Sequence, residues 1–204
     1  MIKIGINGFG RIGRLILRAI IENYQNKIQV VAINDLGSIE TNAHLIKYDS
    51  THGMINEEIK TSKDGFKLAN QDIKVFAEKD PKNIPWGKVG ADVVLECTGI
   101  FLDKDSASKH IEGGAKKVII SAPAKEVDFT LVQGVNSKEL KKEHNIISNG
   151  SCTTNCLAPV AMVLEKTFGI NYGYMTTIHS YTGDQKLLDT LHKDLRRARA
   201  TEGS

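Results

Sequence analysis

The sequence lacks the features that mark membrane, secreted and disulfide-rich proteins. No apolar run in it reaches the roughly 20 residues that a membrane helix requires. The N-terminus, MIKIGINGFG, is typical of a strand followed by a turn and not of a signal peptide. The three cysteines are too few, and odd in number, for a disulfide framework. We therefore expect a cytoplasmic protein with no membrane partner.

A large excess of one charge is also missing. With 27 Lys and Arg against 24 Asp and Glu residues, the net charge is only +3, whereas nucleic-acid-binding proteins usually concentrate basic residues on one face. The one basic cluster, at 196–199, suits a solvated surface or an anionic small substrate equally well. We expect no nucleic-acid partner.

Groups of metal ligands are absent from the sequence as well. Cys152 and Cys156 lie four residues apart, which is not a zinc-binding pattern, and no cluster of His or Cys supplies further ligands. The sequence therefore predicts no metal site.

What the sequence does contain is an alternation of apolar strands and amphipathic helices over its first 150 residues. This order predicts an α/β domain of the doubly wound Rossmann type, with a mostly parallel sheet, at 1–150. We expect strands at 2–7, 29–34, 92–98, 116–121, 130–135 and 145–148, helices at 11–23, 40–48 and 103–112, and small antiparallel strands within 57–77.

A second domain begins near residue 151. A helix from Cys152 to about Phe168 and an alternating strand from Tyr172 to Tyr181 open it. The polar residues that follow cannot close a domain. We interpret 151–204 as the incomplete start of an α+β domain and expect the chain to be a fragment.

The turn after the first strand, GFGRIG, places Gly8, Gly10 and Gly13 in the pattern G-x-G-x-x-G. A strand enters this turn and a helix leaves it, which is the context in which the pattern binds a dinucleotide. The glycines permit a tight turn, a close approach to a pyrophosphate, and close helix–strand packing. The helix N-terminus adds N–H groups and positive potential. The alternative is a glycine turn that merely packs.

Asp35 lies 22 residues past Gly13, at the end of the second strand. A carboxylate there can accept hydrogen bonds from both hydroxyls of an adenosine ribose and would repel a 2′-phosphate. The neighbouring Leu36 is apolar and offers such a phosphate nothing. Asp35 could instead cap a loop, but together with the glycine turn it favours NAD as the cofactor.

Cys152 opens a helix directly after a strand region, within SNGSCTTNC. The helix dipole lowers the pKa of a thiol in that position, and backbone N–H groups there could hold an oxyanion. Cys152 is therefore placed for nucleophilic attack on a carbonyl group. We interpret Cys156, one turn further along, as a buried small apolar residue.

His179 lies in the strand expected at 172–181. A helix running out and a strand running back could bring its imidazole beside Cys152, where it could pair with the thiolate and move protons. A histidine in a strand is often only structural, but with the cysteine and the dinucleotide turn we favour catalysis. The other five histidines, His110 among them, have no such pairing.

Hydroxyl groups flank the cysteine. They could cradle phosphate groups together with an arginine, although Ser and Thr also cap helices and form turns in every protein. The residues concerned are Ser151, Thr153, Thr154, Thr182 and Arg197.

Seven segments, which cover essentially the whole chain, carry a resemblance to a known family. They are INGFGRIGR, AIND, KYDSTHG, KKVIISAPAK, SNGSCTTNCLAP, HSYTGDQ and HKDLRRARA. Together they closely resemble phosphorylating glyceraldehyde-3-phosphate dehydrogenase. The resemblance implies an NAD-binding domain, a catalytic domain and a homotetramer, with glyceraldehyde 3-phosphate and inorganic phosphate as substrates.

The resemblance also implies roles for individual residues. Cys152 would form a thiohemiacetal and then a thioester with the substrate, and His179 would activate the thiolate and act as the base. Phosphate would attack the thioester and give 1,3-bisphosphoglycerate. The remaining implied assignments are Arg11 and Ile12 to the pyrophosphate, Asp35 to the ribose, Thr98 and Phe101 to the adenine side, Ser121 to the cofactor, Ser151, Thr153 and Arg197 to the attacking phosphate, and Thr182 to the substrate's own phosphate.

The chain departs from the family pattern in length and at 190–191, where many NAD-specific members carry Leu-Pro. Family members continue well past the arginine-rich stretch, so we expect little activity from these 204 residues by themselves. Two alternatives stay open. Erythrose-4-phosphate dehydrogenase shares the cysteine motif, although YTGDQ after Ser180 favours the triose enzyme. A nucleotide-binding module without catalysis is the other.

Overall fold

The computed structural model describes residues 1–183 and residue 194. The chain divides into two compact units, Met1–Lys166 and Thr167–Ser204. The first unit holds all of the strands found in the described residues.

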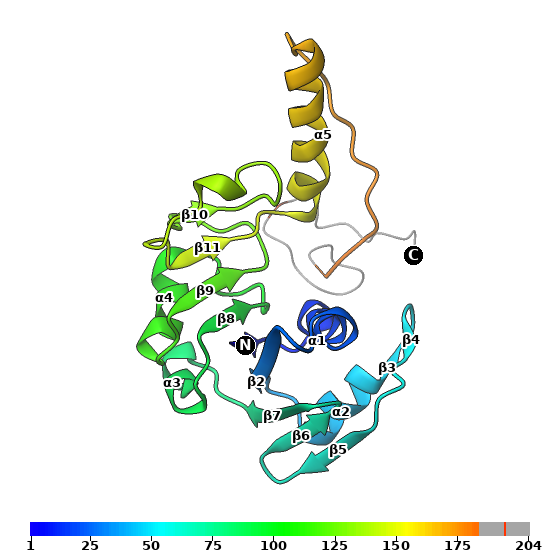
Figure 1. The fold of residues 1–204 in the computed structure, drawn as a ribbon, viewed down its shortest axis with the longest axis vertical. Coiled ribbons are helices and arrows are strands. Elements are labelled where there is room, and N and C mark those ends of the chain that lie inside the picture. The colour runs from blue at the N-terminus through cyan, green and yellow to red at the C-terminus, as the bar shows by residue number, and fades with distance from the viewer. Residues whose placement is uncertain (184–193, 195–204) are drawn as a thin grey trace. The chain divides into compact units, whose positions relative to one another are not determined.

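The first unit is built on one large sheet (Figure 1). Its strands are β1 (Ile2–Asn7), β2 (Ile28–Asn34), β5 (Ile59–Ser62), β6 (Gly65–Leu68), β7 (Gln71–Phe76), β8 (Val93–Glu96), β9 (Lys117–Ile120), β10 (Phe129–Thr130) and β11 (Ile146–Ser148). They lie in the order β10-β11-β9-β8-β1-β2-β7-β6-β5. A separate small sheet pairs β3 (Tyr48–Asp49) with β4 (Gly53–Met54).

The order of the parallel strands is doubly wound. From β10 to β7 every neighbouring pair is parallel, and β6 and β5 extend the sheet as antiparallel strands. The chain builds β2 and β7 on one side of β1, and β8, β9 and β11 on the other. The predicted Rossmann-type fold is therefore confirmed.

Helices cover both faces of the sheet. They are α1 (Arg11–Asn23), α2 (Ile39–Lys47), α3 (Trp86–Val89) and α4 (Lys104–Glu112). A further helix, α5 (Cys152–Phe168), buries no residue, and short 3₁₀ turns lie at Pro81–Asn83 and Ser137–Glu139. In Figure 1, α1 lies on one side of the central strands, and α3 and α4 lie on the other. The right-handed crossovers of parallel strands produce this layering.

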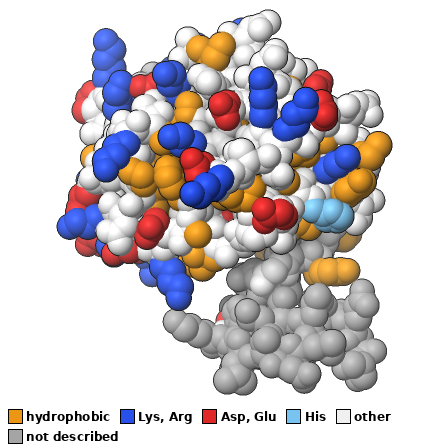
Figure 2. Space-filling view, turned by 90° about the horizontal axis from the view of Figure 1, so that it is seen from below, with side chains coloured by type: hydrophobic (Ala, Val, Ile, Leu, Met, Phe, Trp, Pro, Cys, Tyr) orange, Lys and Arg blue, Asp and Glu red, His pale blue; other side chains and the backbone are white. Residues whose placement is uncertain are grey.

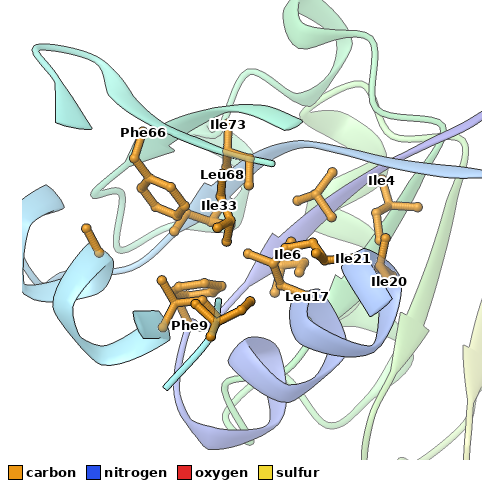
Figure 3. Packing of buried hydrophobic residues seen from close by; sticks show 14 residues of the cluster. Ile4, Ile6, Phe9, Leu17, Ile20, Ile21, Ile33, Phe66, Leu68 and Ile73 are labelled. Carbon is orange, nitrogen blue, oxygen red and sulfur yellow. The ribbon is translucent and has the colours of Figure 1, made fainter. Parts of the chain in front are cut away.

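Apolar side chains fill the space between the helices and the sheet. On the side of α1, Ile6 and Leu17 are fully buried in a cluster that also contains Phe66 (Figure 3). On the opposite face, Trp86 packs with Val94 in a second cluster. Because both faces are covered, the strands carry the nearly continuous apolar runs that the sequence shows.

Two of the predicted helices begin directly after a residue whose side chain caps them. Ser38 Oγ accepts the N–H of Thr41 at 3.1 Å at the start of α2. Asp103 Oδ1 accepts the N–H of Ser106 at 2.8 Å at the start of α4. Each bond satisfies a first-turn donor that has no partner within its helix.

The prediction of a strand at 130–135 is wrong beyond Thr130. The paired strand β10 is only Phe129–Thr130. A turn follows, in which the N–H groups of Val135 and Asn136 both donate to the carbonyl of Val132. Gly134 has a φ of +81°, which a continuing strand does not allow. The apolar residues of this segment therefore belong to a turn.

The strand expected at Tyr172 to Tyr181 is also wrong. These residues have no regular secondary structure, and Tyr174 and Ile178 are fully exposed. Alternation of polar and apolar residues describes a strand only when a neighbouring strand supplies hydrogen bonds. Within the described residues, no strand pairs with this segment.

Charges of both signs are mixed on the surface. On the face in Figure 2, acidic and basic side chains are interspersed and do not gather by sign. That distribution agrees with the small net charge of +3.

Asp128 ties β11, the second strand from the end of the sheet, to the domain. Its Oδ2 accepts the N–H groups of Asn145 at 2.8 Å and Ile146 at 2.9 Å, and its Oδ1 lies 2.7 Å from the Lys104 ammonium. Burial raises the pKa of Asp128, but the hydrogen bonds from Lys104 and the two backbone groups outweigh it and lower the pKa to about 2.

We expect Asp128→Asn to lower the free energy of unfolding by about 1–2 kcal/mol at neutral pH. A lowered folded-state pKa stabilises above the unfolded value near 3.9, and this contribution disappears as the pH falls through about 2. Urea unfolding of both proteins between pH 2 and pH 7 measures the difference. Asp72→Asn, on the exposed face of β7, is the control. A difference that does not shrink in acid would contradict this account.

Candidate functional site

Most of the residues predicted to bind the cofactor gather at the carboxyl edge of the parallel sheet. Asn7, which ends β1, lies opposite Asn34 on β2 and Glu96 on β8. Glu96 lies opposite Ile120 on β9, and Ile120 lies opposite Ser148 on β11. Ligands of open α/β sheets bind beyond this edge, where the strand order reverses, which here is between β1 and β8.

A pocket of about 480 Å³ opens at this point. Five of the residues predicted to bind the cofactor line it, and they come from the ends of three neighbouring strands. These residues are Gly8, Gly10, Asp35, Thr98 and Phe101.

The three glycines of the turn differ in their surroundings. Gly8 has a φ of +87°, and a Cβ there would lie 2.7 Å from the backbone N of Thr98. A Cβ at Gly13 would overlap the carbonyl oxygen of Gly8. A Cβ at Gly10 would meet nothing within 4 Å, and Gly10 lines the pocket. Gly8 and Gly13 are thus required by packing, whereas Gly10 leaves open space toward a ligand.

The helix that follows the turn starts without a side-chain cap. Gly10 is its N-cap, and no side chain in the described part of the chain accepts a hydrogen bond from its first turn. The first turn also contains no acidic residue. Arg11, Ile12 and Gly13 begin this turn, so their N–H groups and the helix dipole can serve an anion.

Arg11 is oriented by an ion pair. Its Nη1 lies 2.8 Å from Asp49 Oδ2 on β3, and the Arg11 side chain is half exposed. The backbone N–H groups of His52 and Thr51, assisted by Arg11, hold the pKa of Asp49 well below its usual value. A fixed anion therefore holds the arginine beside the start of α1.

Asp35 is held by the backbone on both sides. Its Oδ2 accepts the N–H of Phe9 at 2.9 Å, and its Oδ1 accepts the N–H of Gly37 at 2.9 Å. A carboxylate has about four acceptor positions, so both oxygens can still accept hydroxyl groups. Asp35 is thus fixed at the pocket, and its carboxylate can still accept further hydrogen bonds.

Six lining residues were not among the predicted site residues. Glu78 and Lys79 follow β7, whose sequence pattern predicts a small antiparallel strand. Because β7 instead pairs in parallel with β2, its carboxyl end reaches the same edge. If DIKVF had been predicted to form a parallel strand, Glu78 and Lys79 would have been expected at this edge as well. The full set is Asn34, Leu36, Glu78, Lys79, Cys97 and Ile100.

Ser121 lies just after β9 and outside the lining of this pocket. Its N–H donates to the carbonyl of Glu96 at 3.0 Å. Burial raises the pKa of the nearby Cys97 thiol to about 11, although a hydrogen bond with Ser121 opposes the shift. Cys97 is therefore a neutral thiol at neutral pH.

Cys152 is the first residue of α5, which begins close behind β11. Gly150 has a φ of +66° and makes the turn. Ser151 Oγ then accepts the N–H of Thr154 at 2.9 Å, so Ser151 caps the helix. The Asn155 side chain donates to the carbonyl of Asn149 at 2.7 Å and closes the turn from the other side. Cys152 itself is exposed.

The expectation that Cys156 is buried is wrong. Cys156 is exposed, and α5 has no buried residue in the structure. The helix instead presents Val160, Leu164 and Phe168 to solvent. The four-residue spacing correctly puts Cys156 one turn beyond Cys152, but burial depends on what packs against the helix.

The remaining predicted residues belong to α5, to the second unit or to the part of the chain outside the description. Thr153 is the second residue of α5. His179 and Thr182 belong to the second unit, where His179 Nδ1 lies 2.5 Å from the Ser180 carbonyl. The pairing of His179 with Cys152 stays a prediction. Arg197 lies outside the described residues.

The described residues contain neither a metal-binding cluster nor a membrane-spanning helix. Across 1–183 and at 194, no group of three His, Cys, Asp or Glu side chains is arranged to hold a metal ion. Among the same residues, no helix combines the length and apolarity needed to cross a membrane.

A doubly wound sheet, a glycine turn into an uncapped helix, and an anchored acid after the second strand define a dinucleotide-binding protein. Residues 2–104 match the family model described as glyceraldehyde 3-phosphate dehydrogenase, NAD binding domain, and residues 151–204 match its C-terminal domain. The chain therefore belongs to the glyceraldehyde 3-phosphate dehydrogenase family. The resemblance seen in the sequence and the expected NAD cofactor are both confirmed.

Curated relatives named glyceraldehyde-3-phosphate dehydrogenase are similar over nearly the whole chain. The one from Xanthobacter flavus is 56% identical over 199 residues, which is 98% of this chain and 59% of the relative. The one from Geobacillus stearothermophilus is 55% identical over 204 residues, which is 100% of this chain and 60% of the relative. The chain thus spans about three fifths of the length of these relatives.

We expect the three cysteines to react with iodoacetamide at different rates near neutral pH. Cys152 should react fastest, because it is exposed at the start of a helix. Cys156 should follow, and Cys97 should be slowest because its raised pKa leaves little thiolate. Mass spectrometry of peptides from timed samples measures the order, and urea-unfolded protein is the control. Equal rates in the folded protein would argue against an activated Cys152.

Proposed function

We propose that the protein is an NAD-dependent dehydrogenase of glycolysis that converts glyceraldehyde 3-phosphate and phosphate to 1,3-bisphosphoglycerate. The observation that carries this proposal is Cys152 at the start of α5, because α5 leaves the same edge of the sheet as the cofactor pocket. The match of 2–104 to an NAD-binding domain supports the cofactor. The names of the relatives support the substrate.

The pocket suits the adenosine part of NAD. Asp35 would accept the ribose hydroxyls, Thr98 and Phe101 would face the adenine side, and the first turn of α1 would receive the pyrophosphate. Ser121 is proposed for the cofactor on the resemblance alone. When bound, NAD supplies the acceptor for the hydride that the substrate loses.

Cys152 and His179 would carry the covalent chemistry. The Cys152 thiolate adds to the aldehyde carbon and forms a thiohemiacetal, and His179 takes the proton of the new hydroxyl as the carbon is oxidised. The product of this step is a thioester. An oxygen of inorganic phosphate attacks its carbonyl carbon, the bond to sulfur breaks, and the acyl phosphate leaves while the thiolate returns.

Hydroxyl groups and an arginine would hold the two phosphate groups. Ser151, Thr153 and Arg197 are proposed for the attacking phosphate, and Thr182 for the phosphate of the substrate. The position of Ser151 and Thr153 at the start of α5 supports this, since a helix N-terminus favours anions. The alternative is that Ser151 only caps α5 and binds no phosphate.

The relatives' names favour the triose substrate over erythrose 4-phosphate. We further propose a homotetramer in the cytoplasm, on the family resemblance. A boundary between the cofactor domain at 1–150 and the catalytic part at 151–204 is also part of the proposal. The second family match, which begins at 151, supports that boundary.

Substitution of Asp35 tests the choice of dinucleotide. We expect Asp35→Asn to weaken NAD binding about tenfold and to weaken NADP binding less, because the charge that repels a 2′-phosphate is removed. Calorimetric titration of the protein with each dinucleotide measures both affinities. Asp72→Asn, outside the pocket, should bind NAD like the unchanged protein. An equal loss for NAD and NADP would count against this role of Asp35.

A chimera tests the reaction itself. Residues 1–204 would replace the matching part of the Geobacillus stearothermophilus relative, which aligns with all of them. We expect this chimera to reduce NAD when glyceraldehyde 3-phosphate and phosphate are both present. Cys152→Ser should lower kcat on the order of a thousandfold or more. The 204-residue chain alone should produce little NADH.

Cys156→Ser is the matched control for the chimera, since Cys156 lies on the same helix one turn further along. It should keep kcat within about threefold. Activity that survives Cys152→Ser, or faster turnover of erythrose 4-phosphate than of glyceraldehyde 3-phosphate, would overturn the proposed function.

A further inference from the structure

A buried carboxylate lies directly beneath the cofactor pocket. Glu96 ends β8 and is only 1% exposed. Its Oε2 accepts Asn7 Nδ2 at 2.6 Å and contacts His110 Nε2 at 2.8 Å. Its Oε1 accepts the backbone N–H of Thr98 at 2.7 Å and also the Thr98 hydroxyl. These four contacts use all of the acceptor positions of a carboxylate.

The proton on His110 is assigned by Trp86. The indole Nε1–H of Trp86, the only tryptophan in the sequence, points to His110 Nδ1 at 3.0 Å. An indole can only donate, so Nδ1 must accept and the proton must lie on Nε2. His110 therefore donates to Glu96. The three side chains are almost fully buried, so water cannot replace a lost bond.

Glu96 supports one wall of the pocket through Thr98. The Thr98 hydroxyl donates to Glu96 and accepts the N–H of Ile100 at 3.1 Å. Cys97, Thr98, Ile100 and Phe101 all line the pocket. The conformation of this wall therefore depends on the carboxylate.

Glu96 supports the opposite wall through two asparagines. Asn7, which donates to Glu96, accepts Asn34 Nδ2 at 2.8 Å through its Oδ1. Asn34 in turn donates to the carbonyl of Glu78 at 2.9 Å and accepts the N–H of Glu78 at 2.8 Å. Asn34, Glu78 and Lys79 line the pocket from this side. One carboxylate thus connects the two walls through continuous hydrogen bonds.

We propose that Glu96 is a positioning residue for dinucleotide binding, which holds both walls of the pocket in register while His110 and Trp86 hold Glu96. This inference rests on the proposed binding of NAD in the pocket. A buried charge is costly unless every acceptor position is filled, and here the filling groups are the residues that shape the site. Glu96 is not among the residues that line the pocket, and it acts through Thr98 and, by way of Asn7, through Asn34.

Glutamine is the sharpest substitution because it keeps the shape and removes the acceptor pattern. An amide NH₂ in place of Oε2 would face two donors, Asn7 and His110. In the flipped orientation it would face the N–H of Thr98. His110 cannot relieve the first conflict by moving its proton, because Nδ1 must accept from Trp86.

We expect Glu96→Gln to weaken NAD binding at least tenfold, measured by calorimetric titration of the protein. The matched control is Gln71→Leu. Gln71 is 2% exposed and accepts the N–H of Val30 at 2.7 Å, at the opposite end of β7 from the pocket. Gln71→Leu should lose comparable stability in urea unfolding and yet bind NAD within twofold of the unchanged protein.

A second pair of variants covers the case in which Glu96→Gln does not fold. Thr98→Val removes the hydroxyl that joins Glu96 to Ile100, whereas Thr98→Ser keeps it. We expect Thr98→Val to weaken NAD binding about threefold or more, and to weaken it more than Thr98→Ser does.

The outcomes separate this inference from the proposed function. If the unchanged protein does not bind NAD, the proposed function fails, and this inference fails with it. If the unchanged protein binds NAD but Glu96→Gln or Thr98→Val binds it equally well, only the role of Glu96 is overturned. The role of Glu96 would also be overturned if Gln71→Leu weakened NAD binding as much as Glu96→Gln does. A general loss of stability would then explain the weaker binding.

Discussion

The structure depends on the alignment of parallel strand ends at one edge of the sheet. Asn34, Asn7, Glu96 and Ser148 end four strands and occupy one row across the sheet. All four are buried polar residues, and burial of polar groups is tolerated only with hydrogen-bond partners. Some of the partners belong to loops beyond the edge, namely Thr98, Glu78 and Ala122, so satisfying this row also shapes loops that form the pocket.

Two helices start at this edge, and they differ in how their first N–H groups are capped. α1 begins at Gly10, where no side chain of the described residues caps it, and its first turn stays available to an anion. α5 begins behind Ser151, whose hydroxyl caps one N–H group of the first turn, that of Thr154. The thiol of Cys152 is exposed at that start. A dinucleotide site and a nucleophile can thus share one edge of a single sheet.

Sequence patterns failed where the outcome depended on a neighbour in space. The alternation at Tyr172 to Tyr181 predicts a strand, yet a strand needs a partner to supply hydrogen bonds. Cys156 was expected to be buried because of its type, although only a packed partner can bury it. The sequence indicates no role for His110. Its role in the buried hydrogen-bond network depends on Trp86 and Glu96, which lie 24 and 14 residues away. No local pattern contains that information.

By itself, the sequence determined most of the succession of strands and helices in the first 150 residues, the glycine turn, the acid at Asp35 and the cysteine that opens a helix. These features are local, since each depends on side-chain periodicity, backbone freedom or capping within a few residues. Only the tertiary structure decided that β7 brings Glu78 to the pocket, and that Glu96 joins the two walls. Strand register and buried hydrogen bonds connect residues far apart in the chain, and they exist only once the sheet has formed.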